Sequence, residues 1–116
     1  MRKLTKIKDL KMSKYEEAIE RLIEGIRVDY SRFTAGFTYQ EPQEITVSAG
    51  RKFDKLISDR SVWGFIAKAD GEFKGLPYKE GDVFKAASYR APAKHVRGSI
   101  YAESQNWFAW TGPNYL

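Results

Sequence analysis

Residues able to act in catalysis are few in this chain. It holds one histidine, His95, and no cysteine. These counts exclude a two-histidine metal site, a thiolate zinc site and a thiol nucleophile. The chain also has no Gly-x-Ser-x-Gly elbow to present a serine and no Gly-rich phosphate loop. Carboxylate pairs such as Asp54 with Asp59 occur at spacings expected by chance. We therefore predict no catalytic residue, no metal site and no cofactor, in a protein that is not an enzyme.

Residues 81–100 suggest ligand binding instead of catalysis. Small residues leave backbone N–H groups open to a ligand, and the four cations of residues 83–102 face no acid in that stretch. An aromatic side chain between two polar residues can stack on a base. We expect the ligand-binding residues to be Lys85, Ser88, Tyr89, Arg90, Lys94, His95, Arg97, Gly98 and Ser99. The alternative is a solvated basic patch whose alanines simply pack tightly.

The positive charge is unevenly distributed. Residues 1–14 carry a net charge of +5 and residues 83–102 carry +4, within a total of +5. We predict a basic, flexible arm over residues 1–12 and a single domain over residues 13–116. No apolar run reaches the length of a membrane span, and no secretory signal precedes the domain. We expect a cytoplasmic protein without a membrane partner.

The clearest element that could position these residues is a helix. Ser13 and Glu16 have the spacing of a capping box, and apolar residues recur behind them at helical intervals. The pattern predicts an amphipathic helix that begins at residue 14 and ends at or near Gly25.

Short strands are predicted to follow the helix. We expect them at residues 33–39, 45–47, 53–57, 62–68, 83–84, 99–101 and 107–110, with 62–68 at the centre of the sheet. Pro92 and Gly98 predict a short helical turn at 92–97 between them. The expected fold is α+β, with one amphipathic N-terminal helix packed on a mostly antiparallel sheet.

Part of the chain resembles small bacteriophage and prophage proteins. The resemblance lies in Gly81–Tyr89, Ala91–Lys94 and Arg97–Ile100, with flanking likeness at Gly50–Phe53 and Gly112–Leu116. It covers about a third of the chain. It implies a phage origin, and small phage proteins of this kind commonly counter host defence. One class of them, the nucleotide sponges, sequesters cyclic signalling nucleotides.

Four functions remain open from the sequence, of which catalysis is the least supported. The leading hypothesis is an oligomeric sponge that buries a cyclic or modified nucleotide, with phosphate on Arg90, Lys94 and Arg97 and the base on Tyr89. The second is a nucleic-acid binder that uses the N-terminal arm and the same basic block. The third is an inhibitor that binds a host protein through exposed aromatic residues. The aromatic cluster at residues 107–115 is expected to form core or an interface between copies.

Overall fold

The N-terminal helix is longer than its sequence pattern predicts. The computed structural model describes residues 12–35, 44–59 and 61–114. Helix α1 spans Lys14–Phe33, and Ser13 caps it: Ser13 Oγ accepts from the N–H of Glu16, whose side chain accepts from the N–H of Ser13. The predicted capping box is thus confirmed. Ile19, Leu22 and Ile26 form the buried stripe of the helix.

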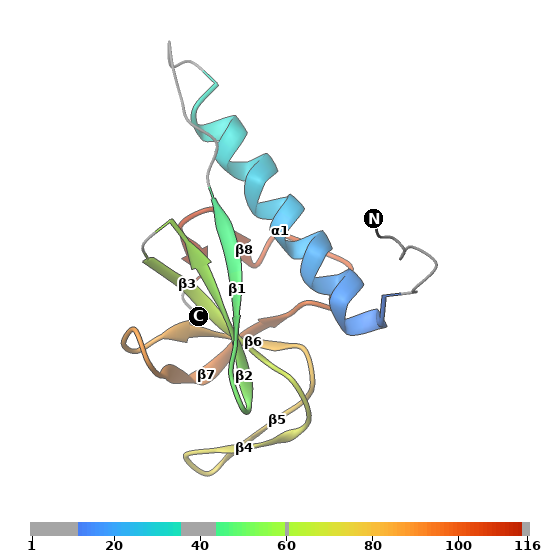
Figure 1. Ribbon diagram of the computed structural model, residues 1–116, viewed down its shortest axis with the longest axis vertical. Helices are drawn as coiled ribbons and strands as arrows, with labels where there is room; N and C mark the ends of the chain where they lie inside the picture. Colours follow the sequence, from blue (N-terminus) through green and yellow to red (C-terminus); the bar gives the residue numbers. More distant parts are fainter. Residues whose placement is uncertain (1–11, 36–43, 60, 115–116) are drawn as a thin grey trace, which may run out of the picture.

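Five strands form one antiparallel sheet, in the order β1-β2-β3-β6-β7. The bounds of these strands are Ile45–Ala49 (β1), Phe53–Ser58 (β2), Ser61–Ala67 (β3), Asp82–Ala86 (β6) and Pro92–Ser99 (β7). The expected α+β architecture and the central position of the 62–68 strand are confirmed (Figure 1).

Two small hairpins complete the fold. They are β4 (Gly71–Phe73) with β5 (Leu76–Tyr78), and β8 (Phe108–Ala109) with β9 (Gly112–Pro113). Trp63 Nε1 donates a hydrogen bond of 3.0 Å to the carbonyl of Ala109, which attaches the β8–β9 hairpin to the sheet.

The sheet separates two apolar cores, because side chains alternate along each strand. Ile66 and Val83 belong to the core under α1 and the β8–β9 hairpin, whereas Phe65 and Phe84 belong to a smaller core under the β4–β5 hairpin. Phe53 packs edge-on against Phe65 and Phe84 in this second core. We call the two sides the helix face and the hairpin face.

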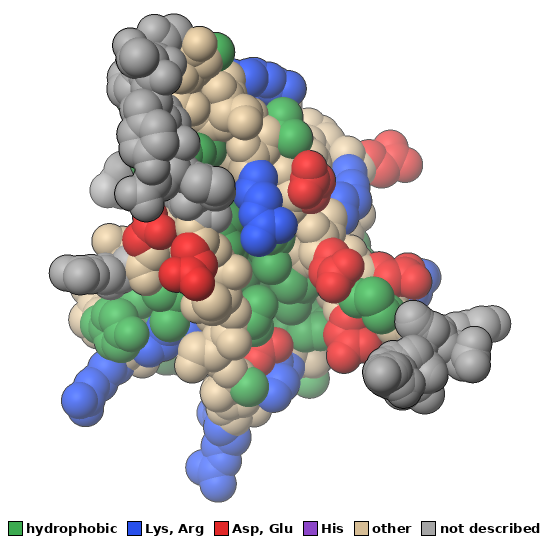
Figure 2. All heavy atoms as spheres, turned by 45° about the horizontal axis from the view of Figure 1, so that its top comes forward, with side chains coloured by type: hydrophobic (Ala, Val, Ile, Leu, Met, Phe, Trp, Pro, Cys, Tyr) green, Lys and Arg blue, Asp and Glu red, His purple; other side chains and the backbone are tan. Residues whose placement is uncertain are grey.

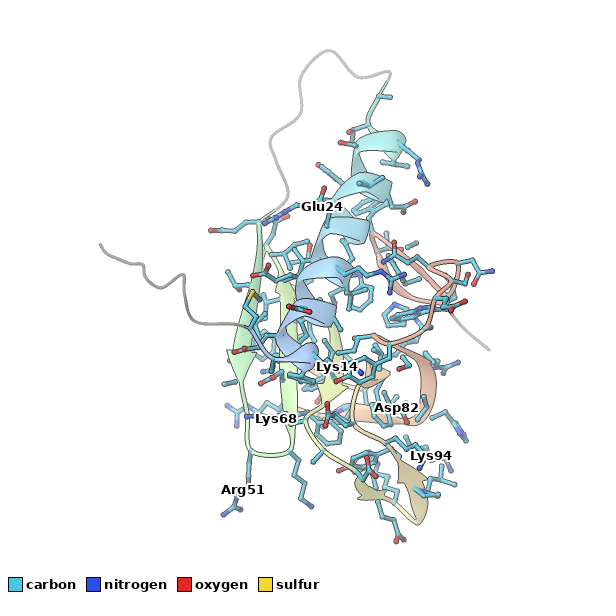
Figure 3. All side chains as sticks on the ribbon, turned by 90° about the vertical axis from the view of Figure 1, so that its right-hand side faces the viewer. Lys14, Glu24, Arg51, Lys68, Asp82 and Lys94 are labelled. Carbon is cyan, nitrogen blue, oxygen red and sulfur yellow. The ribbon has the colours of Figure 1, made fainter. Side chains whose placement is uncertain are left out.

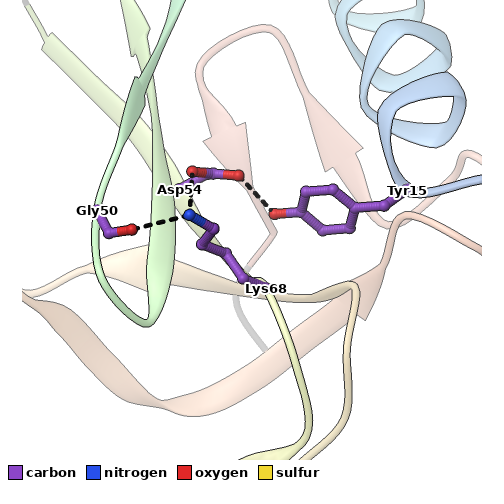
Figure 4. Close-up of polar contacts among 4 residues, drawn as sticks. All are labelled: Tyr15, Gly50, Asp54 and Lys68. Carbon is purple, nitrogen blue, oxygen red and sulfur yellow. Dashed lines mark hydrogen bonds and ion pairs between the residues drawn. The ribbon is translucent and has the colours of Figure 1, made fainter. Parts of the chain in front are cut away.

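A buried carboxylate connects α1 to the sheet (Figure 4). Asp54 is 6% exposed, and its Oδ2 accepts a hydrogen bond of 2.8 Å from the hydroxyl of Tyr15. Lys68 Nζ lies 3.8 Å from Oδ1 of Asp54 and donates to the carbonyl of Gly50. The first turn of the helix is therefore attached to the β1–β2 turn by polar contacts as well as by apolar packing.

Two local predictions about the C-terminal end of α1 were wrong. Gly25 lies inside the helix, where an added Cβ would come within 2.9 Å of Phe108 Cζ. The glycine therefore permits close packing rather than ending the helix. Phe33, expected to begin a strand, is the last residue of α1. The rest of that expected strand reaches into residues 36–43, which lie outside the described residues.

The helical turn predicted at 92–97 was also wrong, because these residues belong to β7. Phe84 pairs with Val96 and Ala86 with Pro92, with irregular register between those pairs. Pro92 occupies the first position of an edge strand, where its missing N–H costs no ladder bond. The strand predicted at 99–101 ends at Ser99, and Ile100 begins a turn.

The aromatic residues near the C-terminus contribute to the core of their own chain. Phe108 is buried, and Trp107 and Trp110 pack against the helix-face core. Tyr115 lies outside the described residues. Among the residues that the structure describes, no helix has the length and apolar character needed to cross a membrane.

Candidate functional site

A basic groove lies on the hairpin face between the β1–β2 turn and the β6–β7 turn. Its volume is about 340 Å³, and it is lined by residues 48–53, Lys55, Phe65, Arg90 and Pro92. Four of these residues are cations, Arg51, Lys52, Lys55 and Arg90, and none is an acid. Since like charges gathered around a concave surface raise the local potential, this groove attracts anions.

Lys55, which lines the basic groove, contacts the ring of Tyr89, which precedes the lining residue Arg90. Lys55 Nζ lies 4.0 Å from the centroid of the Tyr89 ring and 5.9 Å from that of Phe65. Lys55 is paired with Phe65 across β2 and β3, so its position is set by the sheet. Tyr89 belongs to the β6–β7 turn and remains 57% exposed. The turn therefore brings an exposed aromatic ring over a cation that a strand holds in place.

The β6–β7 turn is shaped by local hydrogen bonds. The N–H groups of Ala87 and Ser88 both donate to the carbonyl of Ala91. Ser88 Oγ accepts a hydrogen bond of 3.2 Å from the N–H of Arg90. Small residues and a serine at these positions allow the chain to reverse tightly, with Arg90 at the groove and Tyr89 against Lys55.

The nine predicted ligand residues do not form one site. Ser88, Tyr89 and Arg90 lie on the turn beside the groove. Lys94 and His95 are exposed on β7, outside its lining. Figure 3 shows Lys94 and Arg51 toward the same end of the domain, far from Glu24.

Four of the predicted ligand residues have other surroundings. Lys85 lies beside the β8–β9 hairpin, where its Nζ is 3.8 Å from the position that a Cβ on Gly112 would take. Burial lowers the pKa of Lys85, and the neighbouring Arg97 guanidinium lowers it further. Gly98 lies directly under the Trp107 ring. Ser99 Oγ accepts from the N–H of Tyr101 at the end of β7.

The sequence interpretation missed three cations of the groove, namely Arg51, Lys52 and Lys55. They lie more than 30 residues before Arg90 in the chain, and only the pairing of strands brings them together. A partial signal existed, because Gly50–Phe53 belongs to the part of the chain that resembles phage proteins.

Two other hollows have a different character. A groove of about 670 Å³ between α1 and the C-terminal segment carries Arg21 and Arg32 together with Glu24 and Asp29, so its charges balance. Arg21 also donates two hydrogen bonds to the carbonyls of residues 102 and 103. Neither a cation nor an anion is favoured there.

The second hollow is an apolar groove of about 860 Å³ between the start of α1 and the β1 strand. Its apolar walls include Met12, Ile19, Ile23 and Val47, and Asp54 with Tyr15 lies at its base. In residues 12–35, 44–59 and 61–114, no three histidine, aspartate or glutamate side chains gather to hold a metal ion.

Comparison with known proteins yields one match. A model described as "Family of unknown function (DUF7717)" matches residues 3–115. No curated protein and no solved structure matches the chain.

Proposed function

The chain belongs to the DUF7717 family, whose function is unknown, and we propose from its own geometry that it binds a phosphate-bearing nucleotide in the basic groove. The observation that carries this proposal is the contact of Tyr89 with Lys55, one of four cations among the groove's lining residues, which include no acid. Phosphate recognition requires cations, and nucleobase recognition requires an exposed aromatic face.

Each part of a nucleotide has a counterpart in the groove. Arg51 and Arg90 can bind phosphate oxygens in a bidentate manner, and Lys52 and Lys55 add positive charge. One side of Tyr89 contacts the Lys55 ammonium, and the ring is exposed enough to receive a base on its other side. A volume of about 340 Å³ falls within the range of small-molecule sites.

We propose binding without turnover. The residues lining the basic groove include no histidine, aspartate or glutamate that could transfer a proton. Sequestration of a cyclic signalling nucleotide is the role that the resemblance to phage proteins suggests. That role needs affinity and selectivity for the ligand, both of which a basic groove with a stacking ring can provide.

Binding of single-stranded nucleic acid is a second candidate, favoured by one observation. Lys94 is exposed on β7 and lies toward the same end of the domain as Arg51, so a further cation lies outside the groove (Figure 3). A strand longer than one nucleotide could use this additional cation.

Isothermal titration calorimetry with defined ligands tests the proposal. The probes are 3′,5′-cyclic di-AMP, AMP, inorganic phosphate and a ten-residue oligothymidylate. We expect Lys55→Ala, Arg90→Ala and Tyr89→Ala each to weaken nucleotide binding by about tenfold or more. Tyr89→Ala should leave phosphate affinity nearly unchanged, because phosphate has no base to stack.

The matched control is Lys85→Ala, which removes a cation of the same 81–100 segment on the helix face. It should retain affinity. Equal losses in Lys85→Ala and Lys55→Ala, or no binding of any probe by the wild type, would overturn the proposal. Binding of the oligothymidylate alone would favour the second candidate.

A further inference from the structure

The two edges of the five-stranded sheet are protected very differently. β7 carries Lys94, His95 and Arg97, begins with Pro92 and pairs irregularly with β6. These are the features that keep an edge strand from pairing with another chain. β1 has the sequence Ile-Thr-Val-Ser-Ala, without a charge or a proline, and four of its five residues are exposed. Among the described residues, no strand pairs with its outer edge.

We propose that β1 is the interface between two copies of this chain, paired antiparallel about Val47. In this register each Val47 lies opposite its equivalent, each Thr46 opposite Ser48, and each Ile45 opposite Ala49. The pairing is two-fold symmetric, as closed homodimers require. It also matches β-branched and small hydroxyl side chains across the strands, which favours sheet formation.

Charge complementarity favours a second copy as the occupant of this edge. One end of the β1–β2 hairpin is acidic, because Glu44 and Asp59 lie side by side there. The N–H of Glu44 donates to Oδ1 of Asp59, and the N–H of Asp59 donates to the carbonyl of Glu44. The other end is basic, because Arg51 and Lys52 form the turn. Antiparallel pairing places the acidic end of each copy beside the basic end of the other. Opposite charges thus meet at both ends of the interface.

Apolar surface next to β1 supports the same arrangement. Val47 is 43% exposed and pairs with Leu56 of the helix-face core, so its side chain borders the apolar groove. Figure 2 shows hydrophobic side chains gathered on one face of the domain, with acidic and basic side chains around them. A second β1 strand would cover Val47 and narrow the mouth of that groove, removing apolar surface from water.

The dimer would also change the basic groove, a consequence that depends on the proposed function. Ser48 lines the basic groove, and Thr46 of the second copy would lie opposite it on the same face of the extended sheet. The second copy thus adds a hydroxyl group to the rim of the groove, and a dimer has two such grooves in one continuous sheet.

Sedimentation velocity of the full chain from about 1 to about 300 μM tests the interface. We expect the wild type to form a dimer at the upper concentrations. Val47→Lys should leave only the monomer, because it places two ammonium groups opposite each other at the two-fold axis. Circular dichroism would verify that this exposed substitution leaves the fold intact.

A charge-reversal series gives a second, independent measurement. Glu44→Lys and Arg51→Glu should each weaken the dimer, and the double variant should restore it, since the attraction between copies is then re-formed in the opposite sense. Lys94→Glu reverses a charge on the other edge strand and should have no effect.

A wild type that stays monomeric at every concentration would overturn the proposal. A dimer that Val47→Lys does not dissociate, or a double variant weaker than both single variants, would overturn it too. Sedimentation is measured without nucleotide, so a result against the dimer says nothing against nucleotide binding in the basic groove. Titration of monomeric Val47→Lys with cyclic di-AMP then tests groove binding alone.

Discussion

The hydroxyl of Tyr15, on the first turn of α1, donates a hydrogen bond of 2.8 Å to Oδ2 of Asp54 on β2. The acceptor is a carboxylate that is only 6% exposed, and Lys68 lies 3.8 Å from its other oxygen. A buried carboxylate depends on each of its few partners, because water cannot replace them. This pair therefore fixes where the helix begins on the sheet.

Removal of the Tyr15 hydroxyl should destabilise the protein. Tyr15→Phe keeps the ring but leaves Asp54 without its hydrogen-bond donor, so we expect the free energy of unfolding to fall by about 1–3 kcal/mol. Urea denaturation followed by circular dichroism measures this change. Tyr89→Phe removes a hydroxyl from an exposed ring and should have little effect. Equal stability of Tyr15→Phe and the wild type would contradict the structural role of the pair.

Alkaline pH should weaken the fold through two tyrosines. Burial raises the pKa of Tyr15 well above its ordinary value of 10.0, with the Asp54 hydrogen bond adding to the shift. Burial, followed by the hydrogen bond to Glu80, raises the pKa of Tyr101 to about 12. Above pH 10 the unfolded chain has lost these protons while the folded chain retains them. Stability that is fully present below about pH 10 is therefore lost as the pH rises toward the folded-state pKa values.

The measurement is the free energy of unfolding at about pH 9, 10 and 11. We expect it to fall with pH in the wild type, and to fall less steeply in Tyr15→Phe and in Tyr101→Phe. A slope unchanged by both substitutions would show that other groups, such as lysines, account for the pH dependence.

Local patterns in the sequence predicted the parts of the fold that depend on neighbours in the chain. The capping box at Ser13 and the apolar run at 62–68 both have signals contained within a few residues, and both are confirmed. The basic groove depends instead on the pairing of β2 with β3 and on a turn that brings Tyr89 over Lys55. No spacing rule along the chain relates residues so far apart.

Two residues show why the local signals at 92–98 were misleading. Pro92 suits the first turn of a helix and the start of an edge strand equally well, since neither position needs its N–H. Gly98 suits a helix end, but it also suits a strand that passes close beneath a large ring, which is its position under Trp107. Tertiary packing determines that these residues form a strand and not a helix.

Gly98 should matter for packing and not for ligand binding. A Cβ at this position would lie 2.5 Å from Cδ2 of Trp107, whose ring is held against Phe108 with 4.8 Å between centroids. We expect Gly98→Ala to lower the free energy of unfolding by about 1–3 kcal/mol, as overpacking does elsewhere. Calorimetric affinity for nucleotide, measured where the variant is folded, should stay within about twofold of the wild type. A loss of affinity without a loss of stability would indicate instead that Gly98 takes part in ligand binding.

Gly25 offers the sharpest test of the distinction between a helix cap and a close contact. In the interior of a helix, replacement of glycine by alanine normally stabilises by about 1 kcal/mol. Here the added Cβ would lie 2.9 Å from both Gln105 Oε1 and Phe108 Cζ. The glutamine end can move aside, but the buried Phe108 ring cannot, so we expect Gly25→Ala to destabilise by about 1 kcal/mol.

Urea denaturation of a small set of variants isolates that contact. Ser31→Ala, at an exposed position of the same helix, should raise stability by a few tenths of a kcal/mol, about as much as helix propensity alone predicts. Phe108→Leu replaces the ring with a shorter side chain. In that background Gly25→Ala should lower the free energy of unfolding by less than in the wild type. If Gly25→Ala stabilises the wild type as much as propensity predicts, α1 does not pack as closely on Phe108 as its glycine implies.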